Sequence, residues 1–208
     1  MLAVQHTPNV QDSQIRRYLT DIDTKVQLAF PKALNDVFPE NRELSYREFF
    51  DQLKYPEPNN HEKMGLSFMN GPVHGRRVKT NMKWAALAVI DADSSFDKEM
   101  RVTEGAPDPV LVHEALKEEN ISHCLVTSFS HKQEAKGNRY RVIIPVFLES
   151  QAELRGFLLY ITHLINERDI PLHLTKESYD WGHVWQMPRV KEPNAPFLSL
   201  RHTGTVPD

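Results

Sequence analysis

The chain has 208 residues, 40% of them apolar, and this length and composition predict a folded protein with one sizeable domain or two small lobes. Its formal net charge of −3 excludes a protein that coats nucleic acid through bulk electrostatics alone, although locally clustered basic residues remain compatible with nucleic-acid binding. A single cysteine excludes a disulfide framework, and without a long apolar run or a recognisable signal peptide we expect a cytoplasmic protein that does not span a membrane.

The N-terminal part of the chain is predicted to form a mainly helical accessory lobe. Asp12 is placed to cap a first helix, in which apolar residues recur at helical spacing until a proline interrupts them: Ile15, Leu19, Ile22, Val26 and Ala29. Ser45 and Glu48 form the pattern of a capping box, which predicts a second, short helix. The domain organisation that we expect is residues 1–60 as the accessory lobe and residues 61–208 as the core.

The core is predicted to combine strands and helices in a recognisable order. Apolar runs and alternating patterns indicate the strands, and a proline after Asp108 and a capping box at Ser150 indicate where the helices begin. The strands are expected at 84–93, 121–130, 139–148 and 183–188, with others at 64–69 and 196–200, and the helices at 109–119 and after residue 150. From residue 84 the order is β-α-β-β-α-β, the layout of ferredoxin-like, RNA-recognition-like and polymerase-palm sheets. We therefore predict an α+β fold with an RNA-recognition-like palm.

The strand AALAVIDAD ends in two aspartates that have no basic residue beside them in the sequence. Because strand side chains alternate, Asp91 and Asp93 are expected on one face while Ala92 points to the other. Two neighbouring carboxylates resist desolvation unless a cation neutralises them, and Mg²⁺ or Mn²⁺ is the usual partner of such oxygens. For an isolated pair, a capped turn and a solvated side chain are the commoner explanation.

A second group of polar residues follows the next two predicted strands. The strand CLVTSFSH ends in Ser130 and His131 and is followed by Lys132, and Arg139 and Arg141 share one face of the strand RYRVIIP. A histidine and several cations beside the carboxylate strand suit a polyphosphate, which needs several donors and compensating charge. The alternative is a capped strand end followed by a solvated hairpin.

A third carboxylate, Asp180, precedes the predicted strand HVWQMP. An aspartate that opens a tight turn before Gly182 would explain it equally well by itself. Three such separate explanations would be needed at the ends of neighbouring strands, and a common site for the three aspartates is the simpler interpretation.

In this order the motifs AVIDAD, TSFSH, RYRVIIP and SYD resemble the catalytic domain of the archaeo-eukaryotic primase superfamily, in particular the primase-polymerase domains of phage and plasmid replication proteins. The basic segment HGRRVKTN before the first motif and Pro188, eight residues after the last aspartate, match the same pattern. The resemblance covers about residues 70–190.

The resemblance implies template-dependent nucleotidyl transfer, that is, a DNA primase or polymerase of a phage, plasmid or other mobile element. Two Mg²⁺ or Mn²⁺ ions would assist in-line attack of a 3′-hydroxyl on a nucleoside triphosphate. The implied metal ligands and catalytic residues are Asp91, Asp93 and Asp180. The implied nucleotide contacts are Ser130, His131, Arg139, Arg141 and His183, and the implied nucleic-acid contacts are Arg76, Arg77, Lys79 and Lys132. Single-stranded DNA template, nucleoside triphosphates and a separate replicative helicase are the implied partners.

One departure and three other functions stay open. Many relatives have an arginine where this chain has His183, so the grip on phosphate is in doubt and activity is expected to depend on pH. A catalytically weakened domain that binds single-stranded DNA as a replication-initiation scaffold is the main alternative. A rolling-circle replication nuclease ranks lower, because its His-hydrophobic-His metal pair is missing. An RNA-recognition-like binding module would need stacking aromatics, and Tyr140 is the one good candidate.

Overall fold

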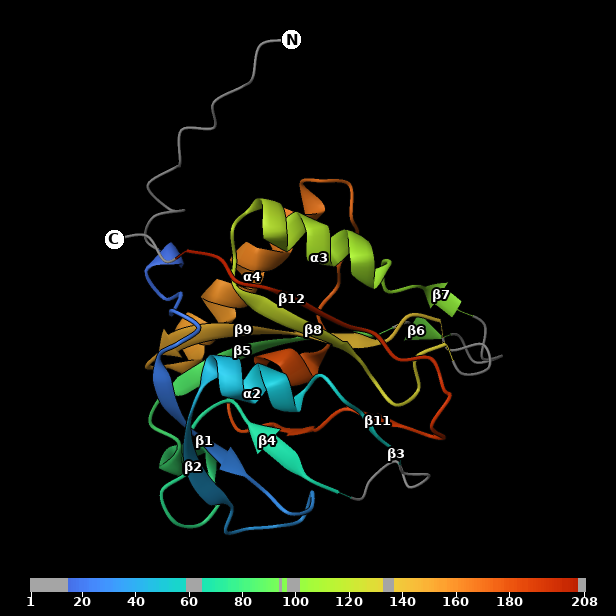
Figure 1. The fold of residues 1–208 in the computed structure, drawn as a ribbon. Coiled ribbons are helices and arrows are strands. Elements are labelled where there is room, and N and C mark those ends of the chain that lie inside the picture. The colour runs from blue at the N-terminus through green and yellow to red at the C-terminus, as the bar shows by residue number, and fades with distance from the viewer. Residues whose placement is uncertain (1–14, 59–64, 94, 97–101, 133–136, 206–208) are drawn as a thin grey trace.

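The computed structural model describes residues 15–58, 65–93, 95–96, 102–132 and 137–205 (Figure 1). Its helices are α2 (Tyr46–Gln52), α3 (Pro109–Glu118) and α4 (Gln151–Asn166), with short 3₁₀ turns η1 (Lys79–Asn81) and η2 (Lys176–Tyr179). Together with several small sheets they make a mixed α/β structure, in agreement with the predicted α+β class. None of the described helices is long and apolar enough to cross a membrane.

A four-stranded antiparallel sheet lies at the centre of the molecule. Its strands run in the order β12-β8-β9-β5, with the bounds β5 (Ala85–Ala92), β8 (His123–Thr127), β9 (Tyr140–Leu148) and β12 (Ser199–His202). Strand β5, helix α3, strands β8 and β9 and helix α4 follow one another along the chain as predicted from the sequence.

The fourth strand of this sheet is not the one that the sequence indicated. The segment predicted at 183–188 contains β10 (Val184–Gln186), which pairs with β4 (Ser67–Met69) in a separate two-stranded sheet. Trp185 explains this position, because its side chain is buried and its indole N–H donates to Asn70 Oδ1 over 2.7 Å, next to the end of β4. The edge beside β8 is instead filled by β12, which overlaps the last predicted strand.

Three further two-stranded pairings complete the described structure. Strand β1 (Lys25–Phe30) pairs antiparallel with β2 (Glu40–Ser45), and β6 (Ser95–Phe96) with β7 (Val102–Glu104). Strand β3 (Glu57–Pro58) pairs parallel with β11 (Arg189–Val190), which brings the N-terminal part of the chain beside its C-terminal part.

Both faces of the central sheet are buried, each against a different layer. Helices α3 and α4 lie on one side, and α2 with β1, β2 and β4 lies on the other (Figure 1). Side chains alternate along β5, so Ala88 and Ile90 pack on the helical side, whereas Leu87 and Val89 pack toward the N-terminal layer. Burial on both faces explains why this strand reads as a near-continuous apolar run.

The prediction of a first helix is wrong for the second half of that segment. Residues Lys25–Phe30 form strand β1, and between residues 15 and 58 strands contribute more residues than helix α2, so the segment is not mainly helical. Val26, Leu28 and Phe30 recur every second residue and pack in one apolar cluster. This segment therefore fits the apolar pattern of a strand as well as that of a helix. Asp12, the expected cap, lies outside the described residues.

The second predicted helix is confirmed as α2, together with its capping box. The Glu48 backbone N–H donates to Ser45 Oγ over 3.2 Å, and the Ser45 backbone N–H donates to Glu48 Oε2 over 2.7 Å. Helix α2 directs Phe49 and Phe50 into the apolar cluster that also contains Leu87. The N-terminal segment therefore shares a core with the central sheet, and the domain boundary at residue 60 stays a prediction.

Candidate functional site

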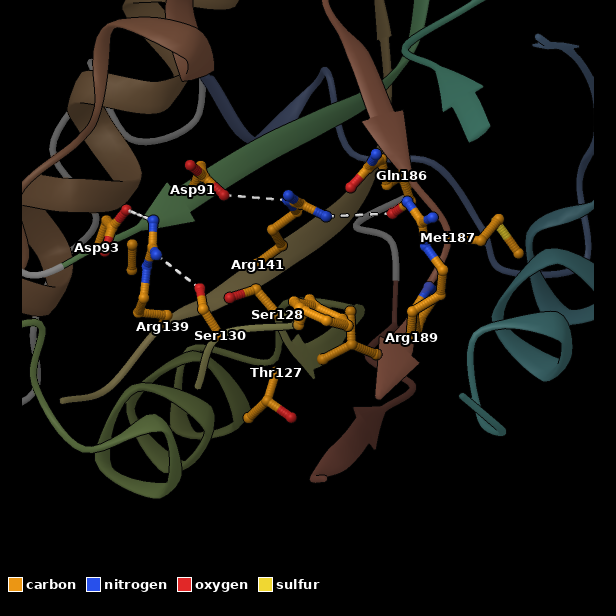
Figure 2. Close-up of a pocket in the computed structure, with 14 residues that line it drawn as sticks. Asp91, Asp93, Thr127, Ser128, Ser130, Arg139, Arg141, Gln186, Met187 and Arg189 are labelled. Atoms are coloured by element: carbon orange, nitrogen blue, oxygen red, sulfur yellow. Dashed lines mark hydrogen bonds and ion pairs between the residues drawn. The ribbon is translucent and has the colours of Figure 1, made fainter. Parts of the chain in front are cut away.

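A pocket lies at the end of β5, where β8 and β9 meet the segment that contains β10 and β11 (Figure 2). Its lining includes several residues singled out from the sequence: Asp91, Asp93, Ser130, Arg139 and Arg141. The rest of the lining comes from the end of β5, the end of β8 and the β10–β11 segment: Ala92, Val126, Thr127, Ser128, Phe129, Gln186, Met187, Pro188 and Arg189. Residues of three of the sequence motifs, AVIDAD, TSFSH and RYRVIIP, therefore meet here.

Asp91 at the end of β5 and Asp93 just after it are each paired with an arginine, Arg141 in β9 and Arg139 just before it. Antiparallel pairing places Asp91 opposite Arg141, and the guanidinium Nε donates to Asp91 Oδ1 over 3.0 Å. The next residue on the same face of each segment gives a second pair, in which the Arg139 guanidinium donates to Asp93 Oδ2. The four side chains are only 20–26% exposed, so these pairs are shielded from much of the screening that weakens surface ion pairs. The aspartates have no basic neighbour in the sequence, but in the structure each is paired with one of the arginines expected beside the carboxylate strand.

Each arginine is also held from a second side. Arg141 donates to the Gln186 carbonyl over 3.1 Å, and its guanidinium lies 5.4 Å from the ring centroid of Trp185. Arg139 donates to Ser130 Oγ over 2.5 Å (Figure 2). Guanidinium groups fixed in this way are pre-organised to receive an anion with little further loss of side-chain freedom.

The chain also supports Asp91 from the segment before β10. The Asp91 backbone N–H donates to Ser178 Oγ over 2.9 Å, and Thr175 Oγ1 lies 3.4 Å from Asp91 Oδ2. Ser178 is fully buried on η2, next to the end of β5. These two hydroxyl groups help to fix the orientation of Asp91.

His131 stands behind the pocket and not in its lining. Its ring is buried, and Nδ1 accepts the backbone N–H of Arg139 over 3.1 Å, so in the neutral ring the proton lies on Nε2. Burial and the positive charge of Lys132 lower the pKa of His131, which favours this neutral form. His131 therefore positions the backbone of Arg139, while Lys132 is exposed beside it.

Asp180 lies outside the pocket lining and has its own cation. Its carboxylate accepts from Lys79 Nζ over 2.8 Å and from the Gly182 backbone N–H over 3.2 Å. Burial alone would raise the pKa of Asp180, but the hydrogen bonds from Lys79 and Gly182 outweigh it and lower the pKa. The structure thus does not bring the third carboxylate to the other two.

His183 lies near the pocket but does not line it. Its ring packs against Trp185 with a centroid separation of 4.2 Å and an angle of 52° between the ring planes, and its backbone N–H donates to the Asp180 carbonyl over 3.1 Å. Burial and the charge of Arg141 lower its pKa, so the side chain is neutral near pH 7. A neutral His183 does not supply the positive charge of the arginine that the resemblance led us to expect at this place.

The residues expected to hold Mg²⁺ or Mn²⁺ do not fit a two-metal site in this arrangement. Across the described part of the chain, no group of three or more His, Cys, Asp or Glu side chains is placed to hold a metal ion. Asp91 and Asp93 bind guanidinium groups, and Asp180 binds Lys79. A carboxylate neutralised by such a partner attracts a hard cation less strongly, so an incoming metal would have to displace these contacts.

Four polar residues of the pocket lining were not predicted as site residues from the sequence: Thr127, Ser128, Gln186 and Arg189. Arg189 is only 2% exposed yet lines the pocket, and it comes from β11, whose parallel pairing with β3 no local pattern encodes. Ser128 Oγ is buried and has no hydrogen-bond partner among the described residues. Ser128 lies inside the motif TSFSH and Arg189 directly follows Pro188, and these are the sequence signals that pointed to Ser128 and Arg189.

The predicted nucleic-acid contacts lie elsewhere. Arg76, Arg77 and Lys79 belong to the loop between β4 and β5, and none of them lines the pocket. Searches for similar proteins do not assign the site: no protein-family model, no curated protein and no solved structure matches this chain.

Proposed function

We propose that the pocket binds the phosphates of a nucleoside triphosphate and that the chain is a primase-polymerase-like domain that adds nucleotides on a single-stranded DNA template. The observation that carries this proposal is the convergence of Ser130, Arg139 and Arg141 with Asp91 and Asp93 in one pocket. The same residues formed the ordered motifs from which the resemblance was drawn.

The chemistry of the lining supports a phosphate ligand. Arg139 and Arg141 bring two guanidinium groups to the pocket, which Arg189 also lines, and such groups match phosphate oxygens with paired donors. Ser128 and Ser130 add hydroxyl groups, of which that of Ser128 has no other hydrogen bond in the described structure. The two aspartates hold two of the arginines in place and keep the pocket from being purely cationic.

Metal-assisted transfer is the reaction that the resemblance implies, and divalent ions would supply charge neutralisation at the reacting phosphate. The carboxylates do not fit that role as they lie here. Support for nucleotidyl transfer therefore comes from the phosphate pocket and from the resemblance, and not from a metal centre.

A second candidate function is favoured by the same ion pairs. If Arg139 and Arg141 keep Asp93 and Asp91 neutralised permanently, the domain would bind single-stranded DNA without catalysis, as a replication-initiation scaffold. The two functions share the phosphate-binding surface and differ in whether the aspartates are needed for turnover.

Incorporation of labelled nucleotides on a primed single-stranded template, with Mg²⁺ or Mn²⁺, tests the proposal. We expect the wild type to extend the primer and the double substitution Asp91→Asn with Asp93→Asn to lose at least about 100-fold in rate, the scale at which removal of a charge-stabilising group acts. Glu43→Ala, which removes an exposed carboxylate on β2, is the matched control and should extend normally.

Equal extension by wild type and double variant would show that the aspartates have no catalytic role. A wild type that extends no primer but binds the template would support the scaffold function. A wild type that neither binds nucleotide nor template would contradict both.

A further inference from the structure

An exposed surface lies on two loops outside the pocket. One loop (31–39) connects β1 with β2, and the other (70–84) connects β4 with β5; we call the exposed part of residues 32–40 and 74–83 the loop surface. Apolar side chains project from it into solvent, among them Phe38, which is 67% exposed. The others are Leu34, Val37 and Val78. An exposed aromatic side chain flanked by further apolar groups marks a contact surface for a partner.

Hydrogen bonds hold the loop surface in one conformation. The Asp36 carboxylate accepts the backbone N–H groups of Lys32 and Phe38, both over 3.0 Å. From the other loop, the Arg77 backbone N–H donates to the Val37 carbonyl over 2.7 Å, and its guanidinium donates to the Leu34 carbonyl over 2.7 Å. Arg77, expected to contact nucleic acid, therefore joins the two loops, and the backbone that carries Phe38 is held by hydrogen bonds.

The charge of the loop surface identifies the kind of partner. Residues 32–40 and 74–83 contain five basic and two acidic side chains, a net charge of +3 in a chain whose overall net charge is −3. The Asp36 carboxylate accepts hydrogen bonds from its own loop, and Glu40 is paired with Arg42 over 2.8 Å. These contacts partly compensate both negative charges, so the repulsion of an incoming anion is reduced. Arg76 and Lys83 are exposed. An aromatic side chain among basic ones is the combination that binds single-stranded nucleic acid.

The loop surface is continuous with the segment that leads to the pocket. Lys79 Nζ lies 2.8 Å from Asp180 Oδ1, and a Cβ atom at Gly182 would lie 3.3 Å from Lys79 Cγ. Two residues later β10 begins, and its Gln186 lines the pocket. A strand that crosses the loop surface is thereby led toward the candidate nucleotide site.

We infer that the loop surface binds a single strand of nucleic acid, with an unpaired base stacked on Phe38 and the flanking phosphates on Arg76 and Lys83. This inference rests on the proposed function, to which it adds the path of the template strand. Stacking on an aromatic ring supplies affinity for any base, and the basic side chains supply the salt-dependent part.

Binding of a fluorescein-labelled 20-nucleotide oligothymidylate to the full chain, followed by anisotropy, tests the inference. We expect Phe38→Ala to weaken binding by roughly tenfold, the effect of losing one stacked base, and Phe38→Trp to retain or improve it. The double substitution Arg76→Gln with Lys83→Gln should lower the slope of log affinity against log salt by about 0.7 for each lost phosphate contact.

Two control variants lie away from the loop surface. Tyr55→Ala removes another exposed aromatic side chain, and Lys25→Gln removes a basic side chain at the far end of β1; both should bind the oligonucleotide like the wild type. Because Phe38 is 67% exposed, its replacement should leave the thermal unfolding temperature unchanged.

Two outcomes separate this inference from the proposed function. Oligonucleotide binding that is the same for wild type, Phe38→Ala and the double variant would overturn the loop surface as the binding site, whatever the pocket does. Nucleotide binding by the pocket is measured separately with ATP. A wild type that does not bind ATP would contradict the proposed function, whereas an oligonucleotide affinity that depends on Phe38 would still support the loop surface as a binding site.

Discussion

At the scale of single residues, the site is built from cross-strand ion pairs. Asp91 and Arg141 are 50 residues apart in the chain and face each other only because β5 and β9 pair in one particular register. Each carboxylate is thus placed where it orients a guanidinium toward the pocket (Figure 2). The electrostatic partners of the aspartates come from the protein itself in this arrangement.

Replacing Ser128 with alanine isolates one proposed phosphate contact. Because Ser128 Oγ has no hydrogen-bond partner among the described residues, Ser128→Ala should leave the free energy of unfolding unchanged. It should weaken ATP binding by about 2- to 10-fold, the effect of one hydrogen bond of about 0.5–1.5 kcal/mol. Isothermal titration with ATP gives the affinity, and Thr203→Ala, an exposed substitution near the C-terminal end of β12, serves as control. Unchanged ATP affinity would remove Ser128 from the site.

At the scale of elements, the close approach of two segments depends on glycine. A Cβ atom at Gly71 would lie 2.2 Å from the carbonyl oxygen of Trp84, which is backbone and cannot rotate away. The Gly71 carbonyl also accepts the backbone N–H of Ala29 over 3.2 Å, so the same residue joins β1 to the start of β5. Nothing lies within 4 Å of the corresponding position at Gly156 in α4.

Alanine at these two glycines should therefore have opposite effects on stability. Gly71→Ala should lower the free energy of unfolding by about 3 kcal/mol, because the two backbone segments must separate. Gly156→Ala should raise it by up to about 1 kcal/mol, since alanine favours the helix more than glycine does. Urea unfolding measures both. A Gly71→Ala variant as stable as the wild type would show that this close approach is relaxed in solution.

A buried histidine cluster joins α3 to the edge of the central sheet. His123 of β8 is fully buried, its Nδ1 lies 2.7 Å from the Ile121 carbonyl, and its Nε2 lies 2.8 Å from His113 Nδ1. His202 of β12 is the third member, with Glu114 and Lys117 nearby. Burial lowers the pKa of His113 and His202, and that of His123 to about 3.

These depressed pKa values predict a loss of stability in acid. The folded state favours the neutral rings, so the stability is complete above the ordinary histidine pKa of about 6.5 and falls as the pH drops toward the folded pKa of His123, about 3. His123 alone should contribute a slope of about 1.4 kcal/mol per pH unit in this window. Unfolding free energies of wild type and His123→Gln between pH 6.5 and 4.5 measure it; equal slopes in the two proteins would contradict this role.

The elements also show what the sequence can and cannot reveal. The apolar runs of β5, β8 and β9 and the capping signals of α3 and α4 are local, and all of these elements were predicted. Ile22, Val26 and Ala29 satisfied a helical spacing, but the tertiary contacts of β1 selected a strand. Strand pairing is not encoded locally, so neither the position of β10 beside β4 nor the contribution of Arg189 to the pocket was predictable. The alternation of side chains predicted that the two aspartates share one face of their strand and that Arg139 and Arg141 share one face of theirs. It did not predict that each aspartate forms an ion pair with one of these arginines.

At the scale of the whole molecule, the N-terminal layer closes one face of the central sheet and leaves the pocket at the end of β5 (Figure 1). The pocket joins residues from β5, the β8–β9 connection and β11, and the loop surface lies on the same N-terminal layer. The arrangement gives the proposed nucleotide site and the proposed template path separate but connected places in one fold.

The affinity of the pocket for nucleotides with different numbers of phosphates tests the central claim most directly. Isothermal titration of the wild type with ATP, ADP, AMP and adenosine should give affinities that fall as phosphates are removed, because each phosphate offers further contacts to the arginines. Arg139→Gln with Arg141→Gln should weaken ATP binding at least about tenfold and leave adenosine binding unchanged. No ATP binding by the wild type, or equal affinity for ATP and adenosine, would contradict the account.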